Sequence, residues 1–212
     1  MAAPRTRKRT LADRSGRERL LAAAVELFAE RGYAATGISE VCARAGVAKT
    51  ALYWHFESKE GLLAEVIEAI GTSWIEQIRK AAYQEGQPEQ RIARLVDEWR
   101  RILLEQPELL RLPMIAGLEQ GDSRRAQRAL RTIWQRAERA LVEGIEDTVG
   151  GELADVDLLA HTVFALLQGA MLRQIIDPDE AQLDRVLQEL RRTVMLLIAD
   201  RLPKEPSAPA GR

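Results

Sequence analysis

Apolar residues recur with the period of an α-helix along nearly the whole of this 212-residue chain. No segment shows the sustained alternation of apolar and polar residues that a half-buried β-strand requires. Glycine and proline residues separate the periodic stretches from one another. The pattern therefore predicts an all-α protein of about nine helices, over residues 17–31, 37–45, 48–54, 58–84, 89–105, 108–119, 123–149, 155–176 and 179–201.

The composition narrows the class of protein. Hydrophobic residues make up 46% of the chain and charged residues 30%, which is typical of a globular protein with a real core. Charges interrupt every apolar run before it reaches the ~20 residues that cross a bilayer, so we expect no membrane partner and a cytoplasmic protein. The single cysteine, Cys42, permits neither an intrachain disulfide nor a multi-thiolate metal site, and we expect it to be a small core residue.

Positive charge is concentrated at the beginning of the chain. Residues 1–59 contain 11 Lys/Arg and 6 Asp/Glu, whereas residues 60–212 contain 20 and 26. This polarity favours a first segment that meets a polyanion such as DNA. On charge alone, a solvated tail around Arg5–Arg9 explains the pattern equally well.

Local signals predict a compact helix-turn-helix domain over residues 15–57. Ser15 and Glu18 have the spacing of a capping box at the first helix, and Thr36 is the expected N-cap of the second. Gly46 tolerates positive φ, so the next two helices can cross at a steep angle. The predicted plan is a basic flexible arm (1–14), this domain (15–57), a helical domain (58–202) and a disordered tail (203–212).

The third short helix of this domain presents side chains suited to DNA on its outer face. A helix fits the major groove, where base edges are distinguishable. The backbone N–H groups beside Thr36 and the amine of Lys59 are expected to contact phosphates. Packing within the protein is the alternative role for the aromatic residues. The DNA-binding candidates of this helix are Ala48 at its start and the outward-facing Lys49, Thr50, Tyr53, Trp54 and His55.

Several short groups of residues in this region, at defined spacings from one another, resemble those of a known protein family. Ala45-Gly46-Val47, Leu52-Tyr53, His55-Phe56 and Ser58-Lys59 resemble the DNA-binding region of the TetR family of transcriptional regulators, over about residues 15–65. The resemblance implies a sequence-specific DNA-binding regulator that binds a double-stranded operator, with Tyr53 on the DNA backbone. Ala48 stands where the family often has serine and Thr50 where glycine is frequent, so the base preference is not transferable.

The same resemblance implies that the remaining helices form a homodimer contact and a cavity for a small-molecule effector. The helices at 155–176 and 179–201 are expected to pair with their symmetry mates, because the first is apolar over more than one stripe. Core packing is the alternative role for each candidate lining residue taken singly. The candidates are Trp74, Ile78, Leu95, Trp99, Ile102, Leu103, Met114, Leu118, Trp134, Gln168 and Met171.

Nothing in the sequence indicates catalysis or a cofactor. The two histidines, His55 and His161, lie in different predicted domains. Asp157 and His161 have a spacing that can hold a metal, but a surface pair explains it better. The expected function is a repressor released from a palindromic operator by a small apolar ligand. The alternative is a ligand-independent helical DNA-binding protein, either an activator or a structural protein.

Overall fold

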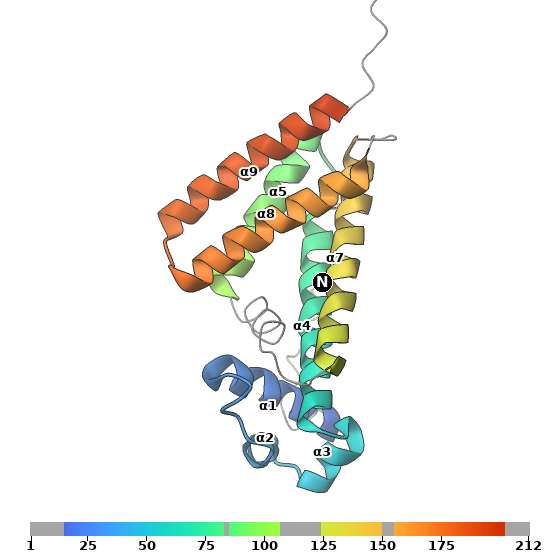
Figure 1. Ribbon diagram of the computed structural model, residues 1–212, viewed down its shortest axis with the longest axis vertical. Helices are drawn as coiled ribbons and strands as arrows, with labels where there is room; N and C mark the ends of the chain where they lie inside the picture. Colours follow the sequence, from blue (N-terminus) through green and yellow to red (C-terminus); the bar gives the residue numbers. More distant parts are fainter. Residues whose placement is uncertain (1–14, 83–84, 107–123, 150–154, 202–212) are drawn as a thin grey trace, which may run out of the picture. The chain divides into compact units, whose positions relative to one another are not determined.

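The structure is a computed structural model that describes residues 15–82, 85–106, 124–149 and 155–201 (Figure 1). These residues form helices and connecting turns and no strand, which confirms the all-α prediction. Most predicted helix ends fall within one or two residues of the observed ones, and the helix predicted at 108–119 lies outside the described residues. The helices are α1 (Gly16–Arg31), α2 (Ile38–Ala45), α3 (Lys49–Phe56), α4 (Lys59–Ala82), α5 (Pro88–Glu105), α7 (Arg124–Val149), α8 (Val156–Ile176) and α9 (Glu180–Arg201).

The chain divides into two compact units. Residues 1–71 and 111–132 form one, which we call the head unit, and residues 72–110 and 133–212 form the other, the body unit. Two long helices, α4 and α7, each contribute residues to both units. The head unit therefore contains the three short helices, and the body unit contains α5, α8 and α9.

The first helix begins at the capping box that the sequence predicts. Ser15 Oγ accepts a hydrogen bond from the Glu18 backbone N–H at 3.3 Å, and the Ser15 N–H donates to Glu18 Oε2 at 2.7 Å. Two backbone donors at the start of α1 are thereby satisfied. The cap fixes where α1 starts and so which of its faces meets α2 and α3.

The core of the head unit is formed by the facing sides of α1, α2 and α3. Leu20, Leu27, Val41, Leu52 and Phe56 are each exposed to 1% or less. Cys42 lies in this core with 3% exposure, as expected, and burial raises the pKa of its thiol. These contacts hold α3 by one face only.

The turn between α2 and α3 depends on Gly46. Its backbone is left-handed, with φ 62° and ψ 42°, and its N–H bonds back to the end of α2. A glycine adopts this conformation without the steric cost that a β-carbon brings. The turn lets α3 leave α2 at an angle and expose its other face.

Aromatic rings occupy the centre of the body unit. The ring centroids of Trp74 on α4 and Trp99 on α5 are 5.5 Å apart in an edge-to-face arrangement, and Trp74 stacks on Phe164 of α8 at 6.3 Å. The antiparallel pair α8 and α9 packs beside α5 (Figure 1). Arg100 of α5 donates to Asp184 of α9 at 2.6 Å, and this bond lowers the pKa of the Asp184 carboxyl.

By length and composition, one described helix is apolar enough to cross a membrane. It is α8, Val156–Ile176, with 39% of its most apolar window buried inside the protein. The core helix of a soluble protein can meet the same criteria, so one such helix is weak evidence for a membrane. The apolar surface of α8 needs another explanation.

Candidate functional site

The outer face of α3 carries the exposed side chains of the head unit that are best suited to DNA. Leu52 and Phe56 are fully buried, whereas Tyr53 is 51% and Trp54 80% exposed. Lys49 and Thr50, one turn earlier, are also exposed. The i, i+4 spacing of the two buried residues turns this face outward. An exposed tryptophan beside a tyrosine is unusual on a surface that faces only water.

Several arginines of the described head unit are already paired with carboxylates. Arg31 pairs with Glu40, Arg17 with Glu65 at 2.5 Å, and Arg44 with Glu26 at 3.2 Å. Lys49, by contrast, forms no ion pair within the part of the chain that the structure describes. Its ammonium is therefore free to neutralise a phosphate without first losing an internal partner.

Lys59 lies at the start of α4 and contacts a residue that the sequence analysis missed. Its Nζ is 4.3 Å from the ring centroid of Tyr33 and 3.4 Å from the Ala34 carbonyl oxygen. Tyr33 itself packs edge-to-face on Phe28 of α1. This cation–π contact fixes the position of the ammonium near the segment before α2. The sequence feature that could have pointed to Tyr33 is the presence of an aromatic residue in the short segment between Gly32 and Gly37.

The prediction that Thr36 is the N-cap of α2 is wrong. Gly37, not Thr36, is the N-cap of α2, and no side chain caps that helix. The Thr36 hydroxyl lies 2.8 Å from the Gly32 oxygen and 3.2 Å from the Leu27 oxygen, and the residue is only 1% exposed. Thr36 therefore ties the end of α1 to the next turn, and its side chain is not presented to a ligand of the head unit.

The remaining two predicted DNA-binding residues flank the exposed face. Ala48 is the exposed N-cap of α3 and makes no side-chain cap hydrogen bond, as expected for an alanine. His55 is partly exposed and packs edge-to-face on Trp54, with ring centroids 4.6 Å apart. The imidazole thus packs against the indole ring of Trp54 and restricts its orientation.

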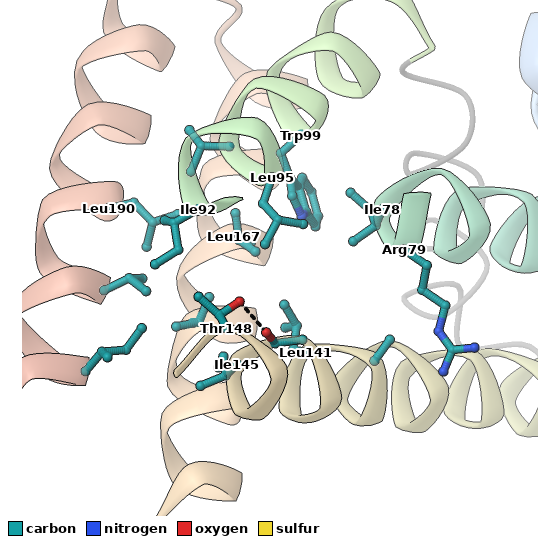
Figure 2. Close-up of a pocket in the computed structure, with 16 residues that line it drawn as sticks. Ile78, Arg79, Ile92, Leu95, Trp99, Leu141, Ile145, Thr148, Leu167 and Leu190 are labelled. Carbon is teal, nitrogen blue, oxygen red and sulfur yellow. Dashed lines mark hydrogen bonds between the residues drawn. The ribbon is translucent and has the colours of Figure 1, made fainter. Parts of the chain in front are cut away.

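The body unit contains an apolar cavity between five helices (Figure 2). Its volume is about 60 Å³. Two polar side chains at its wall are already engaged: the Thr148 hydroxyl donates to the Gly144 oxygen at 2.6 Å, and Arg79 pairs with Glu143. The lining residues are Ile78, Arg79, Ile92, Leu95, Val96, Trp99, Ala140, Leu141, Gly144, Ile145, Thr148, Val163, Leu167, Leu190, Val194 and Ile198.

The structure brings some of the predicted lining residues to this cavity and separates others from it. Ile78, Leu95 and Trp99 line it, and Trp74 lines a smaller neighbouring cavity with Trp99. Met114 and Leu118 lie outside the described residues. Of the described candidates, those that do not line either cavity are Ile102, Leu103, Trp134, Gln168 and Met171.

The reasons differ among the residues that do not line a cavity. Trp134 is 42% exposed on α7, whereas Ile102, Leu103 and Met171 are buried in ordinary packing. The sequence analysis also missed most of the wall contributed by α5, α7 and α9. Helical period shows which side of a helix faces inward, but a cavity wall and a filled core have the same period.

His161 does not pair with Asp157 as a metal-binding couple would. Its Nδ1 lies 3.0 Å from Glu138 Oε1 of α7, and the residue is exposed. Among the described residues no group of three or more potential ligands gathers around it. The contact is a surface pair between α7 and α8.

Comparison with known proteins finds relatives of the helix-turn-helix region and of nearly the whole chain. The family model for bacterial regulatory proteins of the tetR family matches residues 20–66, which include α2 and α3. An HTH-type transcriptional regulator of Mycobacterium tuberculosis is 30% identical over 198 residues, which cover 87% of this chain and 97% of that protein. Three other curated regulators align over shorter stretches, and the chain covers only 18%, 37% and 24% of their lengths.

Solved structures share the fold at low sequence identity. SCO4454, a TetR-family transcriptional regulator from Streptomyces coelicolor, is 20% identical with a TM-score of 0.69, over 89% of this chain and 96% of that one. The transcriptional regulator FadR from Bacillus subtilis, in complex with stearoyl-CoA, is 18% identical with a TM-score of 0.65, over 86% and 97%. These relatives are transcriptional regulators, and the near-full-length match reaches beyond the helix-turn-helix. The chain therefore belongs to the TetR family of transcriptional regulators.

Proposed function

We propose that this regulator is a cytoplasmic homodimeric repressor that leaves a palindromic operator when a small apolar ligand enters the body unit. In this proposal residues 15–57 bind DNA, and residues 58–202 bind the ligand and the second copy. The observation that carries the DNA contact is the division of α3 into a buried face and an exposed one. The observation that supports a small apolar ligand is the apolar cavity of the body unit.

The exposed face of α3 is proposed to enter the major groove. Tyr53 and Trp54 offer flat rings and polar edges, and Lys49 offers an ammonium that forms no ion pair with a described residue. Thr50 can contact a base through its methyl or hydroxyl group. Ala48, His55 and Lys59 flank this face and would position it on the phosphates rather than read bases. Thr36 would act indirectly, by holding the segment between α1 and α2.

The homodimer is supported by an exposed stripe on α8. Six exposed positions recur at alternating spacings of four and three residues, which is the spacing of a helix–helix seam. Leu158 is 59% and Ile176 72% exposed, so large apolar groups stand at both ends. Pairing with a second copy of this helix and of α9 would bury them. The stripe, called the α8 stripe from here on, consists of Leu158, Thr162, Ala165, Gly169, Leu172 and Ile176.

Release of DNA is proposed to pass through α4. This helix begins in the head unit, where Leu62 and Ile67 are fully buried, and ends in the body unit, where Ile78 lines the cavity. A ligand that displaces Ile78 would move one end of a helix whose other end packs in the head core. The operator affinity then falls by the ratio of the ligand's affinities for the two conformations. The stearoyl-CoA bound by FadR supports a ligand with a long apolar part, and this extension to our chain is part of the proposal.

An operator selected from random duplex DNA tests the DNA contact. The full chain is used to enrich binding sites, and the resulting palindrome serves as the operator probe in fluorescence anisotropy. Lys49→Ala and Tyr53→Ala should each weaken binding by about 5- to 100-fold, the range of one lost contact. Lys80→Ala, an exposed lysine of the body unit, is the matched control and should bind normally.

The same assay tests the remaining parts of the proposal. Enrichment of a palindrome with half-sites about 34 Å apart supports a dimer on successive major grooves. Unchanged affinity in both α3 variants would mean that another surface reads the operator. A complex that no apolar small molecule dissociates would leave a ligand-independent DNA-binding protein as the better description.

A further inference from the structure

The indole of Trp74 is a buried hydrogen-bond donor that no described residue satisfies. The residue is 6% exposed, and its Nε1 is screened from solvent with no acceptor within hydrogen-bond distance among the described residues. A buried donor without an acceptor destabilises the protein, so such groups are rare and call for an explanation. Packing against Trp99 and Phe164 fixes the ring, so it cannot easily turn its N–H to water.

Beside this ring lies a second, smaller cavity. Its volume is about 10 Å³, which is close to the space of one water-sized group. Ile78, Trp99, Ala140 and Leu141 line both this cavity and the larger one, so the two cavities share part of their walls. The other residues of its wall are Trp74, Ile75, Ala137 and Phe164. A ligand in the larger cavity that extends past these four shared residues would bring one small group next to the tryptophan ring.

The walls of both cavities disfavour a charged ligand. Arg79 already pairs with Glu143, and in Figure 2 its side chain points away from Leu95, Trp99 and Leu167. The Thr148 hydroxyl donates to a backbone oxygen of its own helix. No carboxylate belongs to either wall. A charged group would lose its hydration and gain no counter-ion.

We infer that the cavity takes a neutral, mostly apolar ligand with one acceptor oxygen, such as a ketone, ester or ether, and that Trp74 Nε1–H donates to this oxygen. This inference rests on the ligand-binding part of the proposed function and names the chemical class of the ligand. The apolar body fills the larger cavity, and the oxygen occupies the smaller one. Trp74 thereby selects for the oxygen, because a hydrocarbon would leave its donor unpaired.

Two probes of nearly equal shape test the inference by direct binding. Acetophenone carries a carbonyl oxygen where cumene carries a methyl group, and benzoate adds a negative charge. We expect the wild-type chain to bind acetophenone about tenfold more tightly than cumene in calorimetric titrations, the ratio that one net hydrogen bond supplies. Benzoate should bind more weakly than either neutral probe. Equal affinity for acetophenone and cumene, or tighter binding of benzoate, would overturn the inference.

A variant and a spectroscopic readout locate the hydrogen bond. Trp74→Phe keeps an aromatic ring and removes the N–H, so it should lose the preference for acetophenone while binding cumene within about twofold of wild type. Trp134→Phe, at an exposed tryptophan outside both cavities, is the matched control and should keep the preference. Of the indole N–H resonances of the four tryptophans, only that of Trp74 should shift downfield with acetophenone. An unmoved Trp74 resonance refutes the inference without any variant having to fold.

The readouts separate this inference from the proposed function. Acetophenone that binds with the Trp74 shift but does not dissociate the operator probe supports the inference and contradicts release by ligand. Cumene and acetophenone that release the operator equally well at equal concentration support release by ligand and contradict the role of Trp74. Failure of both neutral probes to bind counts against the inference, because the cavity would then not accept its class of ligand.

Discussion

Thr36 shows how a hydroxyl that is expected to cap one helix can instead connect two segments of the fold. Its position before α2 resembles an N-cap, but the side chain is buried and bonds toward Leu27 and Gly32. Sequence spacing could not reveal this, because a threonine at a helix start can bond forward or backward with equal ease. The direction was decided by the sharp turn at Gly32, which places the end of α1 within reach.

Thr36→Val should therefore lower stability and spare operator affinity. The valine keeps the shape and loses a buried hydrogen bond, for which we expect a loss of about 1–2 kcal/mol in the free energy of unfolding of the head unit. Thr50→Val is the matched variant on the exposed face of α3 and should show the reverse, with weaker operator binding and unchanged unfolding. Chemical denaturation and anisotropy measure the two quantities. Weaker operator binding by a folded Thr36→Val protein would restore Thr36 as a DNA-binding residue.

At the scale of elements, the junction between α3 and α4 leaves no room for a side chain at residue 61. Glu57 has a left-handed φ of 66°, and the Ser58 N–H bonds to the Phe56 oxygen at 2.7 Å. Gly61 lies in the first turn of α4, and a β-carbon built there would lie 2.0 Å from the same Phe56 oxygen. The close approach of the two helices is possible only because residue 61 has no side chain.

Gly61→Ala should consequently disturb the direction of α3. The clash is with backbone, so the junction must open, and we expect a loss of stability of about 1–3 kcal/mol, typical of overpacking. Operator affinity should fall as well, because α3 no longer points as in the wild type. Gly16→Ala is the control, since its β-carbon would meet nothing closer than 3.7 Å. If Gly61→Ala unfolds at the wild-type temperature and binds the operator with wild-type anisotropy, the junction between α3 and α4 can accommodate a β-carbon, and this prediction is wrong.

The sequence predicted the elements better than the space between them. The capping box at Ser15, the turn at Gly46 and the outward face of α3 all follow from local rules of spacing and backbone conformation. The cavity does not, since it depends on how side chains from five helices fail to fill a common volume. Trp134 and Ile102 illustrate the difficulty: the first is an aromatic residue that is 42% exposed, and the second is an aliphatic residue that is fully buried but lines neither cavity.

At the scale of the whole molecule, the proposed homodimer makes DNA affinity depend on an assembly that a single chain does not contain. One head unit can contact one half-site, whereas two linked head units bind with an effective concentration that raises the affinity of the second contact. The α8 stripe offers the surface for this link, and Leu196 of α9, 62% exposed, adds another large apolar group. Breaking the link should therefore weaken operator binding without touching the DNA-contacting residues.

Ala165→Glu tests this dependence at the middle of the α8 stripe. The position is exposed in one chain, so the monomer should fold normally, but a dimer would bury two carboxylates side by side. We expect sedimentation velocity to show a monomer at micromolar concentration, and anisotropy to show operator binding weakened by about 10²-fold, as when avidity is lost. Gln135→Glu, exposed on α7, adds the same charge elsewhere and should remain dimeric. A variant Ala165→Glu that stays dimeric and binds normally would place the interface on another surface.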